Sequence, residues 1–379
     1  MITRQFDSRL DKLIKPNKVL VVYGPRRVGK TTLIDKYLTH YQGRVYRSTG
    51  ENSVLRRIID SSDFSQIIPF FSSYDLIFID EAQQISQIGQ GLKIIVDQIP
   101  HIKVIATGSS SFDLVSQVGE PLVGRQTILH LYPPAICELI DSYGGAYPLE
   151  QQANLLIYGS YPEVINAKSF IAKKTILAEI RDSYLYKDIL ALDNIKKSAK
   201  IEDLLRLIAY QVGSEVSHNE LGTQLGLSKN TVARYLDLLE KSFVLFRLPP
   251  YYLNARKAIS QKSKYYFYDN GIRNAVIDNF APLSARQDVG ALWENFLIVE
   301  RLKKQSYTSL SANNFFWRTH DQQEVDWVEE RGGRLHGFEF KWHPKALAKN
   351  KNKLAWQTNY PTHATFTTIN RTNYLDFIT

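Results

Sequence analysis

The chain has 379 residues, of which 44% are hydrophobic and 22% charged, an ordinary composition for globular proteins and a length that predicts two or three domains. No apolar run approaches the length that spans a bilayer, and the charged segment 1–15 lacks the apolar core of a secretory signal and reads as a short amphipathic helix. A single cysteine, Cys137, excludes an intrachain disulfide and suits the reducing cytoplasm, while a formal net charge of +9 favours a polyanionic partner, whether DNA, RNA or an acidic protein.

The first pattern along the chain is an apolar run followed by a glycine-rich loop. Residues 19–22 predict a buried strand, and an apolar helix face begins directly after the loop. The glycines allow successive backbone N–H groups to point inward at phosphates, and the positive end of the following helix adds to the attraction. We therefore expect a nucleotide-binding loop made of Gly24, Pro25, Arg26, Arg27, Val28, Gly29, Lys30, Thr31 and Thr32.

Two of these residues have expected roles of their own. Lys30 should reach the β and γ phosphates of ATP, and the Thr31 hydroxyl should ligate Mg²⁺. The alternative is a glycine-rich turn before an ordinary helix.

A second apolar run, residues 76–79, ends in the carboxylates of Asp80 and Glu81, which is a Walker B pattern. Acids at the carboxyl end of a central parallel strand lie in the crevice where open α/β sheets bind ligands. Asp80 would hold Mg²⁺ through water, and Glu81 would orient the attacking water, so hydrolysis is expected as well as binding. Taken alone, the same acids are ordinary for a solvated strand end.

A third predicted strand, residues 102–106, is followed by a cluster of hydroxyl groups at the same edge of the sheet. Ser109 or Ser110 would sense the γ phosphate there. The alternative is a serine-rich turn that caps the next helix.

Four motifs taken together, at residues 24–31, 79–83, 108–110 and 158–162, resemble a prokaryotic AAA+ ATPase family related to STAND switches. The resemblance covers nearly the whole chain and implies a C-terminal region of unknown function. It implies that Gly159 and Pro162 belong to a loop that closes over the base and ribose. It also implies that Arg125 acts as a catalytic arginine near the γ phosphate of its own or a neighbouring subunit, in a homo-oligomer such as a hexameric ring. A solvated arginine that closes a loop is the alternative for Arg125.

Residues 217–241 predict a helix-turn-helix, with a short helix to Leu225, a turn at Gly226, and a second helix from Lys229 capped by Ser228. Lys229, Asn230 and Arg234 would face outward at the start of the second helix and contact DNA. Strands at 243–248 and 265–268 and a basic loop, Arg256 to Lys264, predict a winged version. Winged helices also bind proteins, so a protein partner is the alternative.

The last part of the chain carries a PD-(D/E)XK nuclease pattern on two strands joined by a Gly332-Gly333 turn. Asp326 and Glu339 would hold Mg²⁺, Lys341 would position the attacking hydroxide, and Glu294 would supply a further acid near the metal. In the resembled family this region is similar to Holliday-junction resolvases. The alternatives are a solvated strand face with an ion pair and a decayed nuclease used for binding.

The predicted fold class is α/β: a P-loop parallel-sheet AAA+ core (1–132), a helical lid (133–194), a winged helix-turn-helix (195–270) and a PD-(D/E)XK-like domain (271–379). The expected function is Mg²⁺-dependent ATP hydrolysis coupled to binding or remodelling of duplex or branched DNA, with nuclease activity left open. The alternative is a nucleotide-gated switch that holds a protein partner through its C-terminal region.

Overall fold

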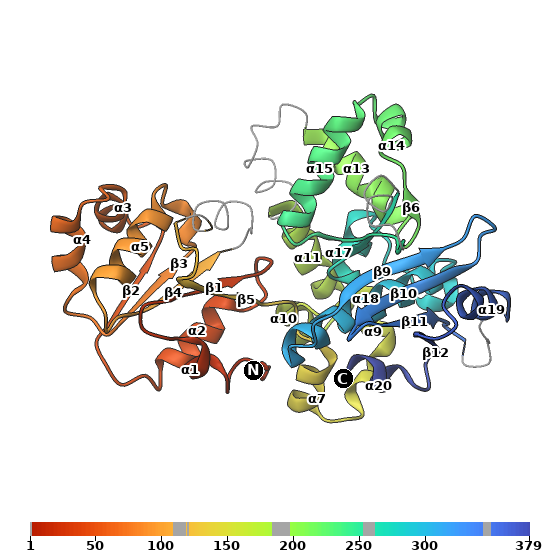
Figure 1. Cartoon of the computed structure of the whole chain (residues 1–379), viewed down its shortest axis with the longest axis horizontal. Coiled ribbons are helices and arrows are strands. Elements are labelled where there is room, and N and C mark those ends of the chain that lie inside the picture. Colours follow the sequence, from red (N-terminus) through yellow and green to blue (C-terminus); the bar gives the residue numbers. More distant parts are fainter. Residues whose placement is uncertain (1, 109–118, 120, 184–197, 253–261, 344–349) are drawn as a thin grey trace. The chain divides into compact units, whose positions relative to one another are not determined.

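The computed structural model describes residues 2–108, 119, 121–183, 198–252, 262–343 and 350–379 (Figure 1). The chain folds into two compact units. The N-terminal unit comprises Thr3–Pro133 with Lys241–Phe243, and the C-terminal unit comprises Met1–Ile2, Pro134–Glu240 and Val244–Thr379. None of the described helices is both long and apolar enough to cross a membrane.

The N-terminal unit is built on a five-stranded sheet in the order β2-β3-β4-β1-β5. All four strand pairs are parallel, so the carboxyl ends of the strands share one edge. The central strand β1 is buried along its whole length, as expected where helices cover both faces of a sheet. The strands are β1 Val19–Tyr23, β2 Val45–Thr49, β3 Leu76–Asp80, β4 Lys103–Gly108 and β5 Gln126–His130.

Short helices connect these strands. Asn52 caps α3 by accepting hydrogen bonds from the backbone N–H groups of Val54 and Leu55, which satisfies donors that have no partner within the helix. The predicted helix within residues 1–15 is confined to one turn. The helices are α1 Leu10–Leu13, α2 Lys30–Leu38, α3 Ser53–Asp60, α4 Phe64–Phe71, η1 Ala82–Gln84 and α5 Ile88–Gln98.

The C-terminal unit contains two sheets and most of the helices. A three-stranded antiparallel sheet has the order β6-β8-β7, and a mixed sheet has the order β12-β11-β10-β9 with β11 and β12 parallel. The strands are β6 Glu215–Val216, β7 Leu245–Leu248, β8 Ser263–Phe267, β9 Asn313–Arg318, β10 Glu324–Arg331, β11 Arg334–Phe340 and β12 Ala364–Ile369.

The helices of this unit follow the chain from the end of the first sheet. They are α7 Ile136–Tyr143, α8 Tyr147–Glu150, α9 Gln152–Tyr158, α10 Pro162–Asn166, α11 Phe170–Ile180, α13 Ser198–Tyr210, α14 His218–Leu225, α15 Lys229–Lys241, α17 Asn270–Val276, η3 Leu283–Ala285, α18 Val289–Thr308, α19 Asn350–Asn359 and α20 Tyr374–Ile378.

Both helices of the predicted helix-turn-helix are present. Helix α14 ends at Gly226, whose φ of 65° lies in the left-handed region that glycine adopts without strain. Ser228 caps α15, because its hydroxyl accepts a hydrogen bond from the backbone N–H of Thr231 at 3.1 Å. Local turn chemistry therefore sets the boundaries of these helices.

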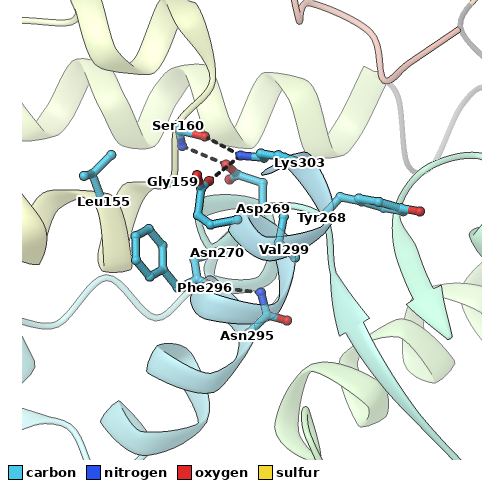
Figure 2. Close-up of a pocket in the computed structure, with 11 residues that line it drawn as sticks. Leu155, Gly159, Ser160, Tyr268, Asp269, Asn270, Asn295, Phe296, Val299 and Lys303 are labelled. Atoms are coloured by element: carbon cyan, nitrogen blue, oxygen red, sulfur yellow. Dashed lines mark hydrogen bonds and ion pairs between the residues drawn. The ribbon is translucent and has the colours of Figure 1, made fainter. Parts of the chain in front are cut away.

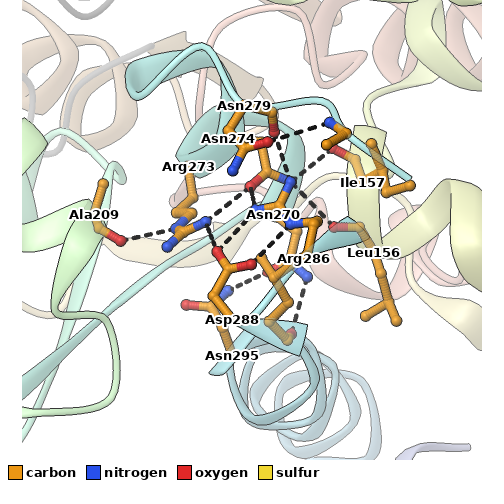
Figure 3. A network of polar contacts seen from close by, with 12 residues as sticks. Leu156, Ile157, Ala209, Asn270, Arg273, Asn274, Asn279, Arg286, Asp288 and Asn295 are labelled. Atoms are coloured by element: carbon orange, nitrogen blue, oxygen red, sulfur yellow. Dashed lines mark hydrogen bonds and ion pairs between the residues drawn. The ribbon is translucent and has the colours of Figure 1, made fainter. Parts of the chain in front are cut away.

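A buried polar network ties the segment expected to be a lid to the rest of the C-terminal unit (Figure 3). Asn274 of α17 donates hydrogen bonds to the carbonyl groups of Leu156 and Ile157 in α9. Arg273 donates from Nε to the carbonyl of Ala209 in α13 and from Nη1 to Asp288 at 2.5 Å. These hydrogen bonds therefore link the helices α9, α13 and α17. Each buried polar group of the network needs its hydrogen-bond partner, because a buried polar group without one is unfavourable. A lid role over the nucleotide stays a prediction.

The turn after α9 is held by a second set of buried groups on α17 and α18 (Figure 2). The Asp269 carboxylate accepts hydrogen bonds from the N–H groups of Ser160 and Ile272, while burial raises the pKa of its carboxyl to about 6. On α18 the Lys303 ammonium pairs with Glu300 at 2.6 Å and donates to the Ser160 hydroxyl at 3.4 Å.

Gly159, next to this set, is expected to tolerate no side chain. Its φ is +71°, and a Cβ there would come within 1.9 Å of the Asp269 carboxylate. Gly159→Ala should therefore destabilise the C-terminal unit by about 1–3 kcal/mol more than Gly144→Ala does. Gly144 is the matched control, because its φ is +93° and nothing lies within 4 Å of its added Cβ.

All five tryptophans, at positions 293, 317, 327, 342 and 356, lie in the C-terminal unit, so tryptophan fluorescence during urea unfolding measures this effect directly. Equal destabilisation by the two variants would contradict the predicted clash with Asp269.

Candidate nucleotide site

The loop between β1 and α2 is folded around one ammonium group. Lys30 is only 6% exposed, and its Nζ donates hydrogen bonds to the carbonyl oxygens of Gly24 at 2.8 Å and Pro25 at 2.9 Å. Gly29 precedes α2 with a φ of 97°, in the left-handed region that favours glycine. At Gly24 the loop passes so close to the backbone of Leu131 that a Cβ would lie 2.0 Å from its carbonyl oxygen.

This enclosure makes Lys30 a cation in need of an anionic partner. Burial lowers the pKa of Lys30 to about 8, and the nearby carboxylates of Glu81 and Asp80 only partly offset the effect. A phosphate group placed at Nζ would favour the charged form. The loop therefore fits the phosphates of a nucleotide.

The predicted Mg²⁺ ligands meet at the carboxyl edge of the sheet. The Thr31 hydroxyl donates a hydrogen bond to Asp80 Oδ2 at 2.8 Å, although 49 residues separate them in sequence. The other oxygen, Asp80 Oδ1, accepts from the Thr107 hydroxyl and from the backbone N–H of Glu81. A hydroxyl and a carboxylate held together in this way are oxygen ligands of the kind that Mg²⁺ prefers.

Glu81 follows directly, with a φ of 48° that turns the chain sharply after β3. Its carboxylate accepts a hydrogen bond from the side-chain amide of Gln83 at 2.5 Å. The charges of Glu81 and Asp80 both act against the effect of burial on the pKa of Lys30.

Two further residues position this site. Thr107, near the end of β4, belongs to the predicted cluster of hydroxyl groups, but the sequence did not predict that it would be fully buried and hydrogen-bonded to Asp80. Arg4, only 7% exposed, donates to the carbonyl of Val28 at 2.7 Å and to that of Tyr132 at 2.6 Å. No periodicity signals that an arginine 15 residues before β1 will hold the phosphate loop in place.

Arg125 lies at the opposite edge of the sheet from the loop. It immediately precedes β5, and Val19, the first residue of β1, pairs with Gln126. The loop follows the last residue of β1, roughly 16 Å further along at about 3.3 Å per residue. The Arg125 side chain pairs with Asp97 at 2.5 Å. At this position the Arg125 side chain is too far from the phosphate loop of its own chain to contact it. The predicted catalytic role would therefore require the loop of a neighbouring subunit.

The remaining predicted nucleotide residues are less informative. Val28 is buried, and Arg27 and Thr32 are exposed. Ser109 and Ser110 lie outside the described residues. Gly159 and Pro162 belong to the C-terminal unit, where Gly159 lies against Asp269 and Pro162 begins α10.

The C-terminal unit brings the predicted nuclease residues near one another. Strands β10 and β11 are antiparallel, and Trp327 is paired with Phe338. The next pair along this register is Asp326 and Glu339, which therefore lie opposite each other. Asp326 Oδ2 accepts a hydrogen bond from the backbone N–H of Phe340 at 2.7 Å, and burial, followed by the Glu294 charge, raises the pKa of Asp326 well above its usual value. Burial lowers the pKa of Lys341, but the paired Glu339 carboxylate outweighs it, with Asp326 and Glu294 adding to the rise.

Among Glu294, Asp326, Glu339 and Lys341, it is Glu339 that has a carboxylate oxygen available for a ligand. It is 1% exposed, and its Oε1 pairs with Lys341 at 2.6 Å. Its Oε2 is buried and has no hydrogen-bond partner within the described chain. A buried carboxylate oxygen without a partner is unfavourable unless a ligand satisfies it.

The predicted basic loop, Arg256 to Lys264, is wrong at its last residue, because Lys264 belongs to a strand. It is 1% exposed in β8, and its ammonium pairs with Glu324 and, at 3.6 Å, with Glu294. Burial lowers the pKa of Lys264, but the Glu294 and Glu324 carboxylates more than offset this and raise it. The ammonium thus compensates the charge of two carboxylates in the cluster. Across the described ranges, no three His, Cys, Asp or Glu side chains are grouped to hold a metal ion.

Family comparisons divide the chain into three consecutive segments. Residues 16–140 match an AAA domain, residues 149–283 match a domain of unknown function (DUF8612), and residues 289–374 match another domain of unknown function (DUF4143). The second match runs across the predicted boundary near residue 194.

Similar curated proteins match over most of the chain. Rv2008c of Mycobacterium tuberculosis, an uncharacterized protein, is 28% identical over 348 residues, covering 89% of this chain and 73% of that protein. An uncharacterized protein of Haemophilus influenzae is 24% identical, covering 95% of this chain and 92% of that protein.

Among solved structures, the Walker-type ATPase paby2304 of Pyrococcus abyssi superposes with a TM-score of 0.52 at 15% identity, over 73% of this chain and 96% of that one. At this identity the likeness shows the fold alone. The chain therefore has an α/β fold with the parallel sheet of a Walker-type ATPase, followed by a domain with a mixed sheet.

Proposed function

We propose that this chain is a Mg²⁺-dependent ATP hydrolase. The observation that carries the proposal is the hydrogen bond between Thr31 and Asp80, made beside the buried ammonium of Lys30. It joins the loop that would hold the phosphates to the strand end that would hold the metal. When bound, Mg²⁺ would neutralise charge on the phosphates, and it would be held by the Thr31 hydroxyl and, through water, by Asp80.

The residues of the site divide the remaining work. Lys30 and the backbone N–H groups of the loop would bind and orient the phosphates. Glu81, held by Gln83, would orient the attacking water and accept its proton. The test is phosphate release from ATP with Mg²⁺ and with EDTA. Tight ATP binding without release would overturn hydrolysis and favour the nucleotide-gated switch.

Nucleotide binding should weaken as the pH rises above about 8, the pKa of Lys30 in the free protein. Above this pH the Lys30 ammonium of the free protein loses its proton. In the complex the negative charge of the phosphates keeps Lys30 protonated, so the complex holds more protons than the free protein. Affinity should therefore fall by up to about tenfold per pH unit. Titration with a fluorescent ATP analogue from neutral to alkaline pH measures the effect.

Lys30→Arg is the control for this titration, because a guanidinium stays charged throughout the range. Its affinity should be lower at neutral pH and nearly independent of pH. A wild-type affinity that is equally flat would contradict the assignment of Lys30.

The C-terminal unit is proposed to bind duplex or branched DNA. Lys229, Asn230 and Arg234 are exposed on one helix, as contact with bases or phosphates requires. Binding of labelled duplex and branched DNA over a salt series, with Lys229→Ala/Arg234→Ala, tests this proposal, because phosphate contacts give a steep loss of affinity with salt. If no DNA binds at low salt, a protein partner becomes the leading alternative.

Metal-dependent cleavage of DNA is a second proposed activity, favoured by the unpartnered Oε2 of Glu339. Asp326 and Glu339 would hold the metal, and Lys341 would position the attacking hydroxide. Cleavage of branched and linear DNA with Mg²⁺ or Mn²⁺ should be lost in Asp326→Ala and in Lys341→Ala. No cleavage by the wild type would leave a binding domain whose acids are compensated by Lys264.

The catalytic role of Arg125 is proposed in trans, in a homo-oligomer. Light scattering with and without ATP tests assembly. A monomer under both conditions would remove Arg125 from the reaction, since the loop of its own chain lies beyond its reach.

A further inference from the structure

A surface pocket of about 220 Å³ lies where α14, α15 and the small sheet of the C-terminal unit meet. Its polar lining comes from segments that are distant in sequence. Ser217 and His218 begin α14, Lys229 begins α15, Arg247 belongs to β7, and Lys262 and Ser263 lie at the start of β8.

The pocket is strongly cationic. Lys229, Arg247 and Lys262 are all exposed, and none of the described residues that line the pocket is acidic. Within the part of the chain that the structure describes, no carboxylate lies within ion-pair distance of these three side chains. Three like charges gathered without a counter-charge repel one another, and an anion in the pocket would relieve this repulsion.

Arg247 is oriented toward a ligand by its own sheet. Its Nε donates a hydrogen bond to the Ser263 hydroxyl on the neighbouring strand at 3.0 Å. This bond fixes the plane of the guanidinium while its Nη groups keep their donors, for which the described residues supply no acceptor. A fixed guanidinium fork is well suited to the paired oxygens of a phosphate group.

His218 lines the same pocket as the three cations. Its ring Nε2 lies 3.4 Å from the Tyr265 hydroxyl. Burial lowers the pKa of His218, and the charges of Arg247 and Lys229 lower it further. The ring is therefore neutral at neutral pH and adds a polar group to the pocket. The positive end of α14 adds to the field at the same place.

The geometry points to this pocket as a phosphate-binding site that holds the backbone of a nucleic-acid strand at the start of α15. This inference rests on the proposed binding of DNA and gives that binding an anchor. A phosphodiester suits the pocket better than a whole nucleotide, because the described lining residues include no Trp, Tyr or Phe that could stack on a base. The exposed Asn230 and Arg234 follow on the same helix, where the strand would continue.

The experiment uses the full chain, a short labelled DNA duplex and a salt series. Arg247→Ala/Lys262→Ala should reduce the slope of log affinity against log salt by about 2, one for each phosphate-neutralising cation removed. Arg206→Ala is the matched control, because this arginine is exposed on α13 outside the pocket, and its slope should stay that of the wild type. A second measurement follows the ring NMR signals of His218 at constant pH while inorganic phosphate is added.

Four outcomes separate the pocket from the DNA proposal. A reduced slope in the double variant, with an unchanged control, supports the anchor. Wild-type slope and affinity in the double variant overturn the pocket and leave DNA binding intact. If no DNA binds but phosphate shifts the His218 signals in the wild type alone, the pocket takes free phosphate and its assignment to nucleic acid is wrong. If neither ligand acts, both proposals fail.

Discussion

Phosphate release from ATP should fall by at least tenfold, and by up to about 10³-fold, in Lys30→Ala and in Glu81→Gln. Lys30 is the enclosed cation of the phosphate loop, so its loss removes both binding and charge stabilisation. Glu81→Gln preserves the shape of the site and removes the group that accepts a proton. We therefore expect Glu81→Gln to lower kcat with little effect on ATP affinity, whereas Lys30→Ala lowers both.

Lys36→Ala is the matched control for this prediction. Lys36 lies on the same helix, but its ammonium pairs with Asp7 at the surface, away from the loop. Its turnover should stay within about twofold of the wild type, since surface pairs contribute little. Turnover that is unchanged in both Lys30→Ala and Glu81→Gln would show that another site hydrolyses ATP.

The fold should survive the loss of Lys30. The pKa of its ammonium is lowered from 10.5 to about 8 in the folded protein, so burial of the charge opposes folding near neutral pH. Lys30→Ala should thus show the expected loss of turnover without a lower melting temperature. If the melting temperature of Lys30→Ala fell by a large amount, unfolding and not the loss of the ammonium would explain the lower turnover.

Arg301→Met should destabilise the C-terminal unit by about 3–5 kcal/mol, the largest effect on stability that we expect from one substitution. The Arg301 guanidinium of α18 donates two hydrogen bonds, at 2.5 and 2.9 Å, to the carboxylate of Glu329 in β10, and Glu329 is fully buried. The side chains of Trp327 and Gln305 also donate to the same carboxylate. Without Arg301 the buried Glu329 charge would keep these neutral donors and only one cation, Arg331, whose Nε lies 3.3 Å from Oε2.

The pH dependence of this variant has a definite sign. In the wild type burial raises the pKa of Glu329, but Arg301 outweighs burial and lowers it, so the pair stabilises the fold above the ordinary glutamate pKa and loses this contribution in acid. In Arg301→Met, only Arg331 and the Trp327 hydrogen bond still oppose the effect of burial, and the pKa of Glu329 should rise above its wild-type value. The loss of stability should then grow as the pH increases from acid to neutral.

Urea unfolding followed by tryptophan fluorescence measures both effects, because Trp327 bonds directly to Glu329. Arg334→Met, at an exposed position on β11, is the control and should change stability by less than about 0.5 kcal/mol. Arg301→Met/Glu329→Gln should recover part of the loss, since the buried charge is gone. A double variant as unstable as the sum of its single variants would contradict the buried-charge explanation.

The sequence by itself determined the elements whose signals are local. The order of apolar strand, glycine loop and helix predicted β1, the phosphate loop and α2. Gly226 and Ser228 marked the ends of α14 and α15, and the Gly332-Gly333 pair predicted the turn between β10 and β11, where both residues have positive φ. Each of these features depends on backbone conformations and hydrogen bonds within a few residues.

One long-range feature also followed from the sequence. In a parallel sheet the carboxyl ends of the strands share an edge, so the loop after β1 and the acids after β3 had to lie near one another. The hydrogen bond between Thr31 and Asp80 is the structural result. The same reasoning places Arg125, which precedes its strand, at the opposite edge.

Only the tertiary structure decided which charged side chains became internal. Lys264 reads in sequence as part of a basic loop, yet it is buried against Glu324, 60 residues away. Arg4 lies in a segment whose sequence predicts a short amphipathic helix, yet its side chain donates hydrogen bonds to the carbonyls of Val28 and Tyr132. A charge can be buried only where distant partners satisfy it, and hydrophobic periodicity carries no information about those partners because it records only neighbours along the chain.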